Sequence, residues 1–447
     1  MMKKRNFALS LAFTGLCALT AGAETPKYIF YFIGDGMGMG HVMATRNYLR
    51  TVHNPDSLPL MMTFPVASPV QTYSFSSTTT DSAAAGTALS TGNKTNNYML
   101  GVSPDTIPVT SIAVNLKDQG YGIGVITSVA PDDATPGAFY AHVRDRKLFD
   151  DITADAAASG YDLIAGAGLR GSADAADVLR RGGFDVVYGL DEFNASTAPR
   201  KFLLDTHTEH PWSIGYTIDG PWGSLNLPDM TEAAISHLSV THPERFFLMC
   251  EGGNIDHAAH SNDGAAVIRE VLAFQDAIRH AYNFYLEHPD ETLIIVTADH
   301  DTGGMAAKGN ARFDLVDVQK ISKDKFNEMC RDIAETASMS WPEMKAQLRE
   351  LFSLGDAIPL SEKDEEELSA MFAATMSGTA GSEQTIYNSY SDFVGRVFRI
   401  INEAMGIGWI SGSHTSNPVP VFAIGNGAER FGYFMNNTDI PYAIIER

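Results

Sequence analysis

The chain has 447 residues, of which 54 are Asp or Glu and 32 are Lys or Arg, so its formal net charge is -22 at pH 7. Hydrophobic residues make up 44%, which excludes a disordered or fibrous protein. At about 100–200 residues per domain, this length fits two or three domains or one large α/β domain with insertions. An acidic surface argues against binding along a nucleic-acid backbone, where Lys and Arg must displace counterions. An anionic ligand would need local positive charge in its pocket.

The amino end predicts a secretory signal peptide. A KKR run precedes an apolar stretch too short to span a bilayer, and the tripeptide AGA ending at Ala23 is a small-x-small cleavage site. We expect residues 1–23 to be removed, which takes three basic side chains from a charge of -22 and leaves -25. The mature protein would be periplasmic or secreted, with no membrane span. The alternatives are a retained anchor and a lipoprotein at Cys17, which the bulky Leu16 disfavours.

Short β-rich runs alternate with helical patterns, which predicts an α/β fold with a mostly parallel central sheet and helices on both faces. The predicted strands are 27–33, 121–127, 161–165, 184–188, 246–250, 293–297 and 418–424. The segment after Asn262 has the wide apolar stripe of a helix that packs on a core. In such a fold, functional residues gather at the carboxyl ends of the strands.

Helical patterns dominate residues 305–410, where we expect helices over 325–336, 341–352 and 385–405. This stretch is expected to be a helical insertion within an α/β domain of residues 24–447. It would form a cap or a dimer contact beside the site. The acidic run at 364–367 is better explained as a solvated helix face than as a metal site, because four consecutive residues do not converge on one point.

Carboxylates and imidazoles follow three of the predicted strands and precede a fourth. They are Asp35, Glu251, Asp256, His257, His260, Asp299, His300 and His414. Asp256 and His260 are four residues apart, so one helical turn would place them on the same face. Any one of these residues alone is more simply a helix cap, a surface residue or a core residue. Together they predict a site for two or three ions with oxygen and nitrogen ligands, which suits zinc and magnesium.

The segment TTTDSAAAGTALSTGNKT predicts a helix that begins near Ser82. Free backbone N–H groups at a helix start favour bound anions, although a simple Asp or Ser cap is the alternative. Beside metal ions, the Ser82 hydroxyl would be a nucleophile that needs no histidine base.

These motifs, in this order, resemble the alkaline phosphatase family, whose secreted bacterial members bind two zinc ions and one magnesium ion. The resemblance covers most of the chain outside the helical insertion and is carried by IGDGMG, TDSAAAGTALSTGNKT, DATPGAFYAHVRDR, EGGNIDHAAH, TADHDTGG and a terminal His414. It implies hydrolysis of small phosphate monoesters through a phosphoserine intermediate, and a homodimer.

Residue by residue, the resemblance implies a nucleophile, an arginine that grips the phosphate, and three metal sites. These are Ser82; Arg146, with Arg144 as the fallback; Asp256, His260 and His414 for the first zinc; Asp35, Asp299 and His300 for the second; and Asp35, Thr135 and Glu251 for magnesium. Asp133 and His257 would lie near the third ion, and this mixed pairing leaves the identity of that metal open. The two zinc ions would clamp both ends of an in-line displacement.

Three other functions are less well supported. A phosphodiesterase of the same superfamily typically has a threonine nucleophile and lacks the equivalents of Thr135 and Glu251. A sulfatase needs Pro and Arg at fixed spacing after its nucleophile, which SAAAG does not provide. A non-catalytic metal- or phosphate-binding protein would be expected to have lost a ligand or the nucleophile. Bound divalent ions would also let the pocket attract a phosphate ester, although the acidic surface excludes polyanions.

Overall fold

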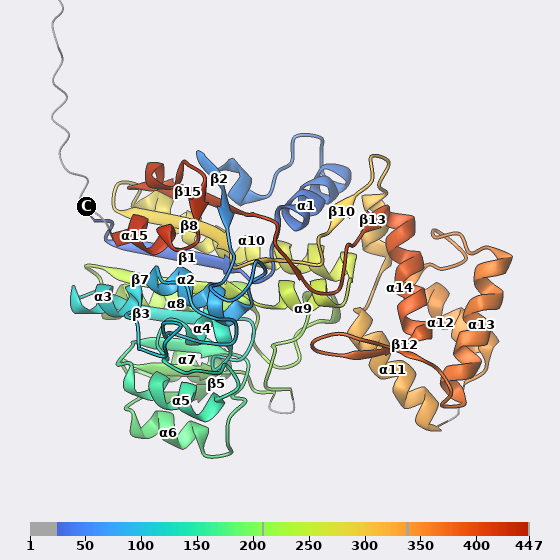
Figure 1. The fold of residues 1–447 in the computed structure, drawn as a ribbon, viewed down its shortest axis with the longest axis horizontal. Helices are drawn as coiled ribbons and strands as arrows, with labels where there is room; N and C mark the ends of the chain where they lie inside the picture. Colours follow the sequence, from blue (N-terminus) through green and yellow to red (C-terminus); the bar gives the residue numbers. More distant parts are fainter. Residues whose placement is uncertain (1–24, 208–209, 337–338, 446–447) are drawn as a thin grey trace, which may run out of the picture.

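The computed structural model describes residues 25–207, 210–336 and 339–445 (Figure 1). In these segments ten strands form one sheet in the order β16-β2-β15-β8-β1-β7-β3-β4-β6-β5. Every paired strand is parallel to its neighbour except β15, which runs antiparallel to both β2 and β8. The predicted signal peptide, residues 1–23, lies outside the described residues.

All seven predicted strands are present, each within two residues of its expected ends. In sheet order the strands are β16 Met435–Asn436, β2 Val66–Gln71, β15 Val419–Gly425, β8 Thr292–Ala298, β1 Tyr28–Gly34, β7 Phe246–Gly252, β3 Gly122–Thr127, β4 Leu163–Gly166, β6 Lys201–Leu204 and β5 Asp185–Tyr188. Sequence reasoning missed β2, β6 and β16. β2 was missed because it contains Pro69. Proline is rare in strands away from the sheet edge, yet β2 lies second from the edge.

Helices cover both faces of the sheet, as alternate side chains of β1 show. Phe32 packs against Phe274 of α10 (Gly264–Glu287), whereas the Tyr31 hydroxyl donates to the carbonyl of Leu89 in α2 (Ser82–Thr91). The remaining helices of the α/β part are α1 Met39–Val52, α3 Ile112–Asp118, α4 Ala134–Gly137, α5 Phe149–Ala158, α6 Ala175–Arg181, α7 Gly189–Ala195, α8 Leu227–Thr241, α9 Asn254–His260 and α15 Asp439–Ile445. The predicted α/β fold is therefore confirmed.

The central strands bring their carboxyl ends to one edge of the sheet. In the register of the sheet, Gly34 of β1 lies opposite Gly252 of β7 and Ala298 of β8, so the residues that follow these strands are neighbours. Because β15 is antiparallel to β8, its beginning meets the same edge. His414, in the short strand β14 (His414–Thr415) before β15, pairs with Thr302 there.

Four helices between residues 305 and 410 pack together beside the α/β part (Figure 1). They are α11 Lys323–Thr336, α12 Trp341–Phe352, α13 Glu362–Met376 and α14 Asp392–Met405. Rings of Phe326, Phe352 and Phe398 from three of these helices meet in their core. The chain leaves and returns through the antiparallel pair β10 (Ala306–Ala307) and β13 (Ile407–Gly408).

The helix predicted over 385–405 is wrong in its first part. The helix begins at Asp392, where the Ser391 hydroxyl accepts from the backbone N–H of Val394. The preceding residues form a hairpin of β11 (Ser382–Gln384) and β12 (Ser389–Ser391). Among the described residues no helix is both long and apolar enough to cross a membrane.

Candidate active site

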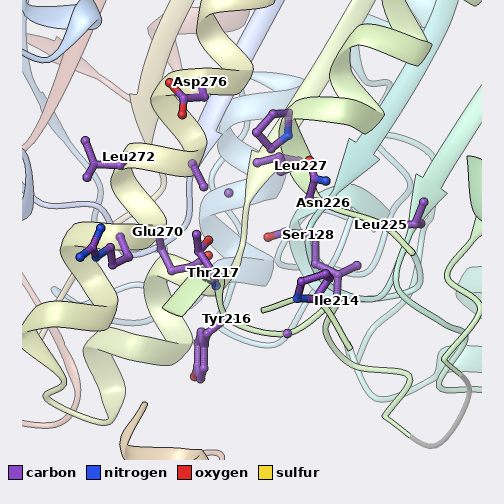
Figure 2. A pocket seen from close by; sticks show the side chains of 16 residues that line it. Ser128, Ile214, Tyr216, Thr217, Leu225, Asn226, Leu227, Glu270, Leu272 and Asp276 are labelled. Carbon is purple, nitrogen blue, oxygen red and sulfur yellow. Dashed lines mark hydrogen bonds between the residues drawn. The ribbon is translucent and has the colours of Figure 1, made fainter. Parts of the chain in front are cut away.

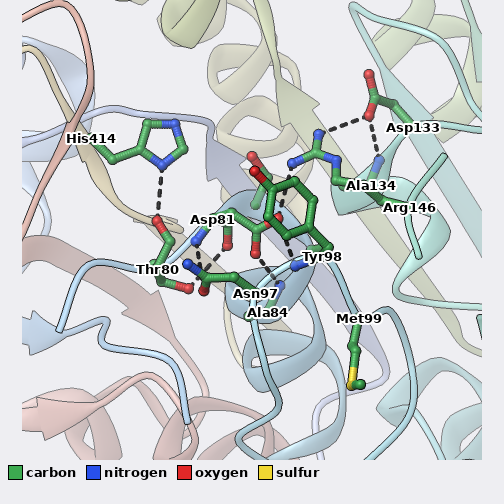
Figure 3. A network of polar contacts seen from close by, with 12 residues as sticks. Thr80, Asp81, Ala84, Asn97, Tyr98, Met99, Asp133, Ala134, Arg146 and His414 are labelled. Atoms are coloured by element: carbon green, nitrogen blue, oxygen red, sulfur yellow. Dashed lines mark hydrogen bonds and ion pairs between the residues drawn. The ribbon is translucent and has the colours of Figure 1, made fainter. Parts of the chain in front are cut away.

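Two histidines and one carboxylate form the first cluster. His260 Nδ1 lies 2.7 Å from the carbonyl oxygen of Gly412, and His414 Nδ1 lies 2.9 Å from that of Thr80 (Figure 3). Carbonyls only accept, so in the neutral rings both Nδ1 atoms carry the hydrogen, and both Nε2 atoms are acceptors. These Nε2 atoms are 3.0 Å apart, with Asp256 oxygens 3.3 and 3.7 Å away. Acceptors this close repel unless they share a cation, so the cluster fits a metal ion.

A second cluster joins Asp35, Asp299 and His300, which follow β1 and β8. His300 Nε2 lies 3.3 Å from Asp35 Oδ1 and 3.2 Å from Asp299 Oδ2. The Thr302 hydroxyl donates to Asp256 and can therefore accept from His300 Nδ1, 3.2 Å away, which leaves His300 Nε2 without a hydrogen. Here too, acceptor atoms converge on one point.

Buried oxygens without hydrogen-bond partners also fit bound cations. In the part of the chain that the structure describes, these include Asp35 Oδ1, Asp299 Oδ2 and Thr135 Oγ1. A buried polar atom without a hydrogen-bond partner lowers the free energy of unfolding by about 1–3 kcal/mol. Three such atoms in one region therefore indicate that a bound ligand supplies their missing partners. Divalent ions with oxygen and nitrogen ligands would satisfy these atoms.

Glu251, predicted with Asp35 and Thr135 to hold a third ion, lies opposite Ile33 in the sheet, two residues before Asp35, and Thr135 is buried in α4. Glu251 is the sixth residue of β7 and accepts from the Thr127 hydroxyl at 2.5 Å. Burial raises the pKa of Glu251 to about 8, and the pKa of Asp35 also rises because of burial and the nearby Asp299 carboxylate. Such carboxylates ionise readily only when a cation compensates them.

Ser82 is the first residue of α2 and contacts the second cluster through His300. Its hydroxyl lies 3.3 Å from His300 Nε2, and the His300 ring stacks on the His414 ring with centroids 3.6 Å apart. Asp81 caps the helix by accepting from the backbone N–H of Ala84. Asp81, and not Ser82, is therefore the N-cap of α2. The Ser82 hydroxyl is not needed for capping and lies beside His300.

Arg146 is held by two carboxylates, Asp81 at the start of α2 and Asp133 at the start of α4 (Figure 3). Its Nη2 lies 2.9 Å from Asp133 Oδ1 and its Nη1 lies 3.4 Å from Asp81 Oδ2. Arg144, in contrast, is exposed and lines a separate hollow beside Thr106. The geometry thus favours Arg146 over Arg144 as the residue that meets a bound anion.

Asp133 and His257, predicted to lie near the third ion, have other neighbours as well. Both carboxylate oxygens of Asp133 accept from arginines, Arg146 and Arg170. Although burial opposes it, these two charges lower the pKa of Asp133 to about 2. The His257 ring lies 4.1 Å from the ring of Tyr387. Asp133 therefore positions Arg146, and its contact with a metal ion stays a prediction.

Sequence reasoning missed Tyr387 because it lies in the stretch wrongly predicted as helix. The β11–β12 hairpin extends from the helical segment toward α9 (Figure 1), and the Tyr387 hydroxyl at its tip donates to Asp256 Oδ2 at 2.9 Å. Arg170 was missed too, because nothing in its sequence neighbourhood marks a contact with Asp133. Only the tertiary structure brings these two residues to the site.

Tyr387→Phe is expected to weaken metal binding at the first cluster by about tenfold, because hydrogen bonds to ligand carboxylates orient them. Competition with a zinc-sensitive dye would measure the affinity. Tyr390→Phe is the matched control on the same hairpin, because its hydroxyl bonds to Ser261 and Asp324 and to none of the metal ligands. Equal metal affinity in the wild type and the Tyr387 variant would contradict this role.

A second cavity, of 460 Å³, is lined mainly by α10, the start of α8 and the chain before α8 (Figure 2). None of the predicted site residues lines it. Glu270 points into it and accepts from the backbone N–H of Thr217, and burial raises the pKa of Glu270 to about 7. A larger cavity of 720 Å³ shares His257 and Tyr387 with the site.

Candidate metal-ligand clusters, buried at the carboxyl edge of a mostly parallel sheet, are typical of α/β metal-dependent enzymes. Comparison with known proteins places the chain in the same class. The alkaline phosphatase family model matches residues 26–208 and 210–446. The chain therefore belongs to the alkaline phosphatase family, whose members are metal-dependent hydrolases of phosphate monoesters.

Individual relatives support the same assignment. Alkaline phosphatase 4 of Bacillus subtilis is 30% identical over 434 residues, which cover 92% of this chain and 87% of the relative. A cold-active alkaline phosphatase from Shewanella sp. superposes with a TM-score of 0.79 at 27% identity, covering 93% of this chain and 98% of that chain. A variant of alkaline phosphatase from the Antarctic bacterium TAB5, with Mg bound in its M3 site, has a TM-score of 0.66 at 25% identity, with 94% and 97% covered.

Proposed function

We propose that this chain hydrolyses phosphate monoesters through a phosphoserine at Ser82. The observation that carries the proposal is the position of the Ser82 hydroxyl, buried at the start of α2 and 3.3 Å from His300 of the second cluster, whose ring stacks on His414 of the first. Backbone N–H groups at this helix start favour the charge of a phosphoryl group. Arg146 can donate two N–H groups to the phosphoryl oxygens.

In the first displacement, the Ser82 Oγ attacks phosphorus and the bond from phosphorus to the alcohol oxygen breaks. Water then attacks the phosphoserine, releasing inorganic phosphate and restoring the Ser82 hydroxyl. Asp81 and Asp133 keep the Arg146 guanidinium aimed at the phosphoryl group throughout. Because the transition state is loose, positioning and charge neutralisation supply most of the rate, and broad specificity toward the alcohol is expected.

We assign two zinc sites and one magnesium site. Asp256, His260 and His414 would hold the first zinc, Asp35, Asp299 and His300 the second, and Asp35, Thr135 and Glu251 the magnesium. Support comes from the converging acceptors and the unpaired buried oxygens of these residues. When bound, the ions would lower the pKa of a coordinated hydroxyl and offset negative charge on the phosphoryl oxygens.

A substrate panel tests the proposal: a phosphate monoester, a phosphate diester and a sulfate ester, before and after chelation and with zinc and magnesium restored. We expect the monoester to be the best substrate, and the rate to vanish on chelation and return with the metals. A better diester substrate, or a rate that survives chelation, would overturn the proposal.

Arg146→Ala is expected to lower kcat/KM for a monoester by about 100-fold and to weaken inhibition by inorganic phosphate, since a bidentate charged contact is lost. Arg144→Ala is the matched control, two residues away on an exposed side chain, and should change either value less than about twofold. Steady-state kinetics with phosphate as inhibitor measure both effects. If kcat/KM and phosphate inhibition decreased equally in the two variants, the proposed contact between Arg146 and the phosphoryl group would be wrong.

Export and oligomeric state are proposals of the same kind. We propose a signal peptide of residues 1–23, a periplasmic or secreted mature enzyme, and a homodimer. Mass spectrometry of the exported protein should find Glu24 as the first residue, and light scattering should give twice the chain mass.

The helical segment 305–410 is proposed to act as a cap or a dimer contact beside the site.

A further inference from the structure

The 720 Å³ cavity lies between the α/β part and the helical segment. One wall comes from the chain that follows β6, with Trp212 and Trp222, and the opposite wall comes from α11, with Lys325 and Arg331. Its volume falls within the range of about 300–1,000 Å³ that is usual for pockets that hold small organic ligands.

The near end of this cavity borders the candidate active site. Tyr387 lines the cavity, and its hydroxyl is 2.9 Å from the Asp256 carboxylate. Arg170 also lines it, and its Nη1 is 2.8 Å from Asp133, the carboxylate that holds Arg146. One end of the cavity therefore lies at side chains that contact Asp256 and the carboxylate that holds Arg146.

Aromatic rings gather at the far wall. The Trp212 and Trp222 rings are 6.5 Å apart at 84°, and the His210 ring lies 4.9 and 4.7 Å from them. The Trp212 side chain is 42% exposed, so part of its ring is free to contact a ligand. Flat aromatic groups stack favourably on such indole rings.

Charges on the cavity wall balance one another. Three cationic side chains, Arg170, Lys325 and Arg331, stand against three carboxylates, Asp219, Asp324 and Glu328. Two of the carboxylates already accept hydrogen bonds, Asp219 from Ser322 and Asp324 from Tyr216. A lining without net charge favours a neutral ring with polar edges over a charged group.

We propose that this cavity is the subsite for the alcohol half of the substrate and that it prefers alcohols that carry an aromatic ring, nucleosides above all. The inference rests on the proposed monoesterase activity and adds a preference to it. The phosphoryl group would stay at Ser82 and Arg146, while the nucleobase stacks against Trp222 and Trp212. The helical segment would then contribute to substrate choice, because α11 and the hairpin carrying Tyr387 complete the cavity.

The test compares adenosine 5′-monophosphate with glycerol 2-phosphate in the full-length, metal-loaded enzyme. Both are alkyl phosphates, so intrinsic reactivity differs little and the cavity decides the outcome. The ratio kcat/KM is the measure, because it covers the steps up to departure of the alcohol. We expect the nucleotide to be favoured about tenfold in the wild type.

Trp222→Ala should remove most of this preference by lowering kcat/KM for the nucleotide about tenfold, with less than about twofold change for glycerol 2-phosphate. Trp212→Ala should act in the same direction, and Trp222→Phe, which keeps a ring, should retain most of the preference. Trp341→Ala is the matched control, because Trp341 packs on Phe372 within the helical segment and does not line the cavity.

The outcomes separate the two proposals. Failure of the wild type to hydrolyse either ester would overturn the proposed function itself. Hydrolysis of both esters at equal kcat/KM, or an equal loss for both in Trp222→Ala and Trp212→Ala, would overturn the subsite and leave the monoesterase standing. A selective loss for the nucleotide, with unchanged metal content, supports the subsite.

Discussion

Ser82→Ala is expected to lower kcat for phosphate monoesters by about 10⁴-fold or more, because the attacking oxygen is lost. The change removes one buried hydroxyl that makes no helix cap, since Asp81 performs that function. Metal content, measured by atomic emission, should stay the same as in the wild type. Rapid quenching with a labelled substrate should trap a phosphoenzyme in the wild type and none in the variant.

Ser90→Ala is the matched control for this prediction. Ser90 lies in the same helix, and its buried hydroxyl donates to the carbonyl of Ala138 at 2.7 Å. Its loss should lower the free energy of unfolding by about 1 kcal/mol and leave kcat nearly unchanged. A Ser82→Ala enzyme that retains a tenth of wild-type kcat would refute the nucleophile assignment.

Removing the metal ions is expected to make the stability of the protein fall as the pH rises from about 6.5 to about 8, because burial holds the pKa values of His257, His300 and His414 below 6.5 and these rings no longer titrate there. In the metal-free protein, burial raises the pKa of Glu251 to about 8 and that of Asp299 to about 7. In the unfolded chain both groups titrate near pH 4. The folded state therefore holds protons that the unfolded state releases, and the stabilisation that these two carboxyls contribute below about pH 4 is lost by about pH 8.

The size of this effect follows from the shifts. Each pKa unit corresponds to about 1.4 kcal/mol, so the two groups together should remove several kcal/mol of unfolding free energy. Bound divalent ions should abolish this loss, because they coordinate the ionised carboxylates. Thermal unfolding at pH 5, 6.5 and 8, with and without chelator, measures the difference.

Glu251→Gln provides the control, since an amide keeps the shape of the side chain but does not titrate. The metal-free variant should lose less stability between pH 5 and 8 than the metal-free wild type. Equal changes in stability between pH 5 and 8 for the metal-free wild type and the metal-free variant would contradict a raised pKa of Glu251.

The predicted strands agree with the structure because their signal is local. Every residue of β1, β7 and β8 is buried, so each forms a nearly continuous apolar run, with candidate ligands at or just after its carboxyl end. The short strand β6 and the proline-containing β2 lack that signal and were missed. The 385–405 helix was misjudged because the hairpin at its start depends on contacts with the site.

The sequence by itself determined the α/β class, the seven strands and the positions of the candidate ligands, because periodicity and motif order are properties of neighbouring residues. Only the tertiary structure decided which ligands meet. The antiparallel direction of β15 brings His414 to His260 across 154 positions of sequence. Likewise, a hairpin far along the chain places Tyr387 on Asp256, and the carboxylates of Asp81 and Asp133 hold Arg146, whereas Arg144 is exposed. Such contacts depend on how distant elements pack, which no local pattern encodes.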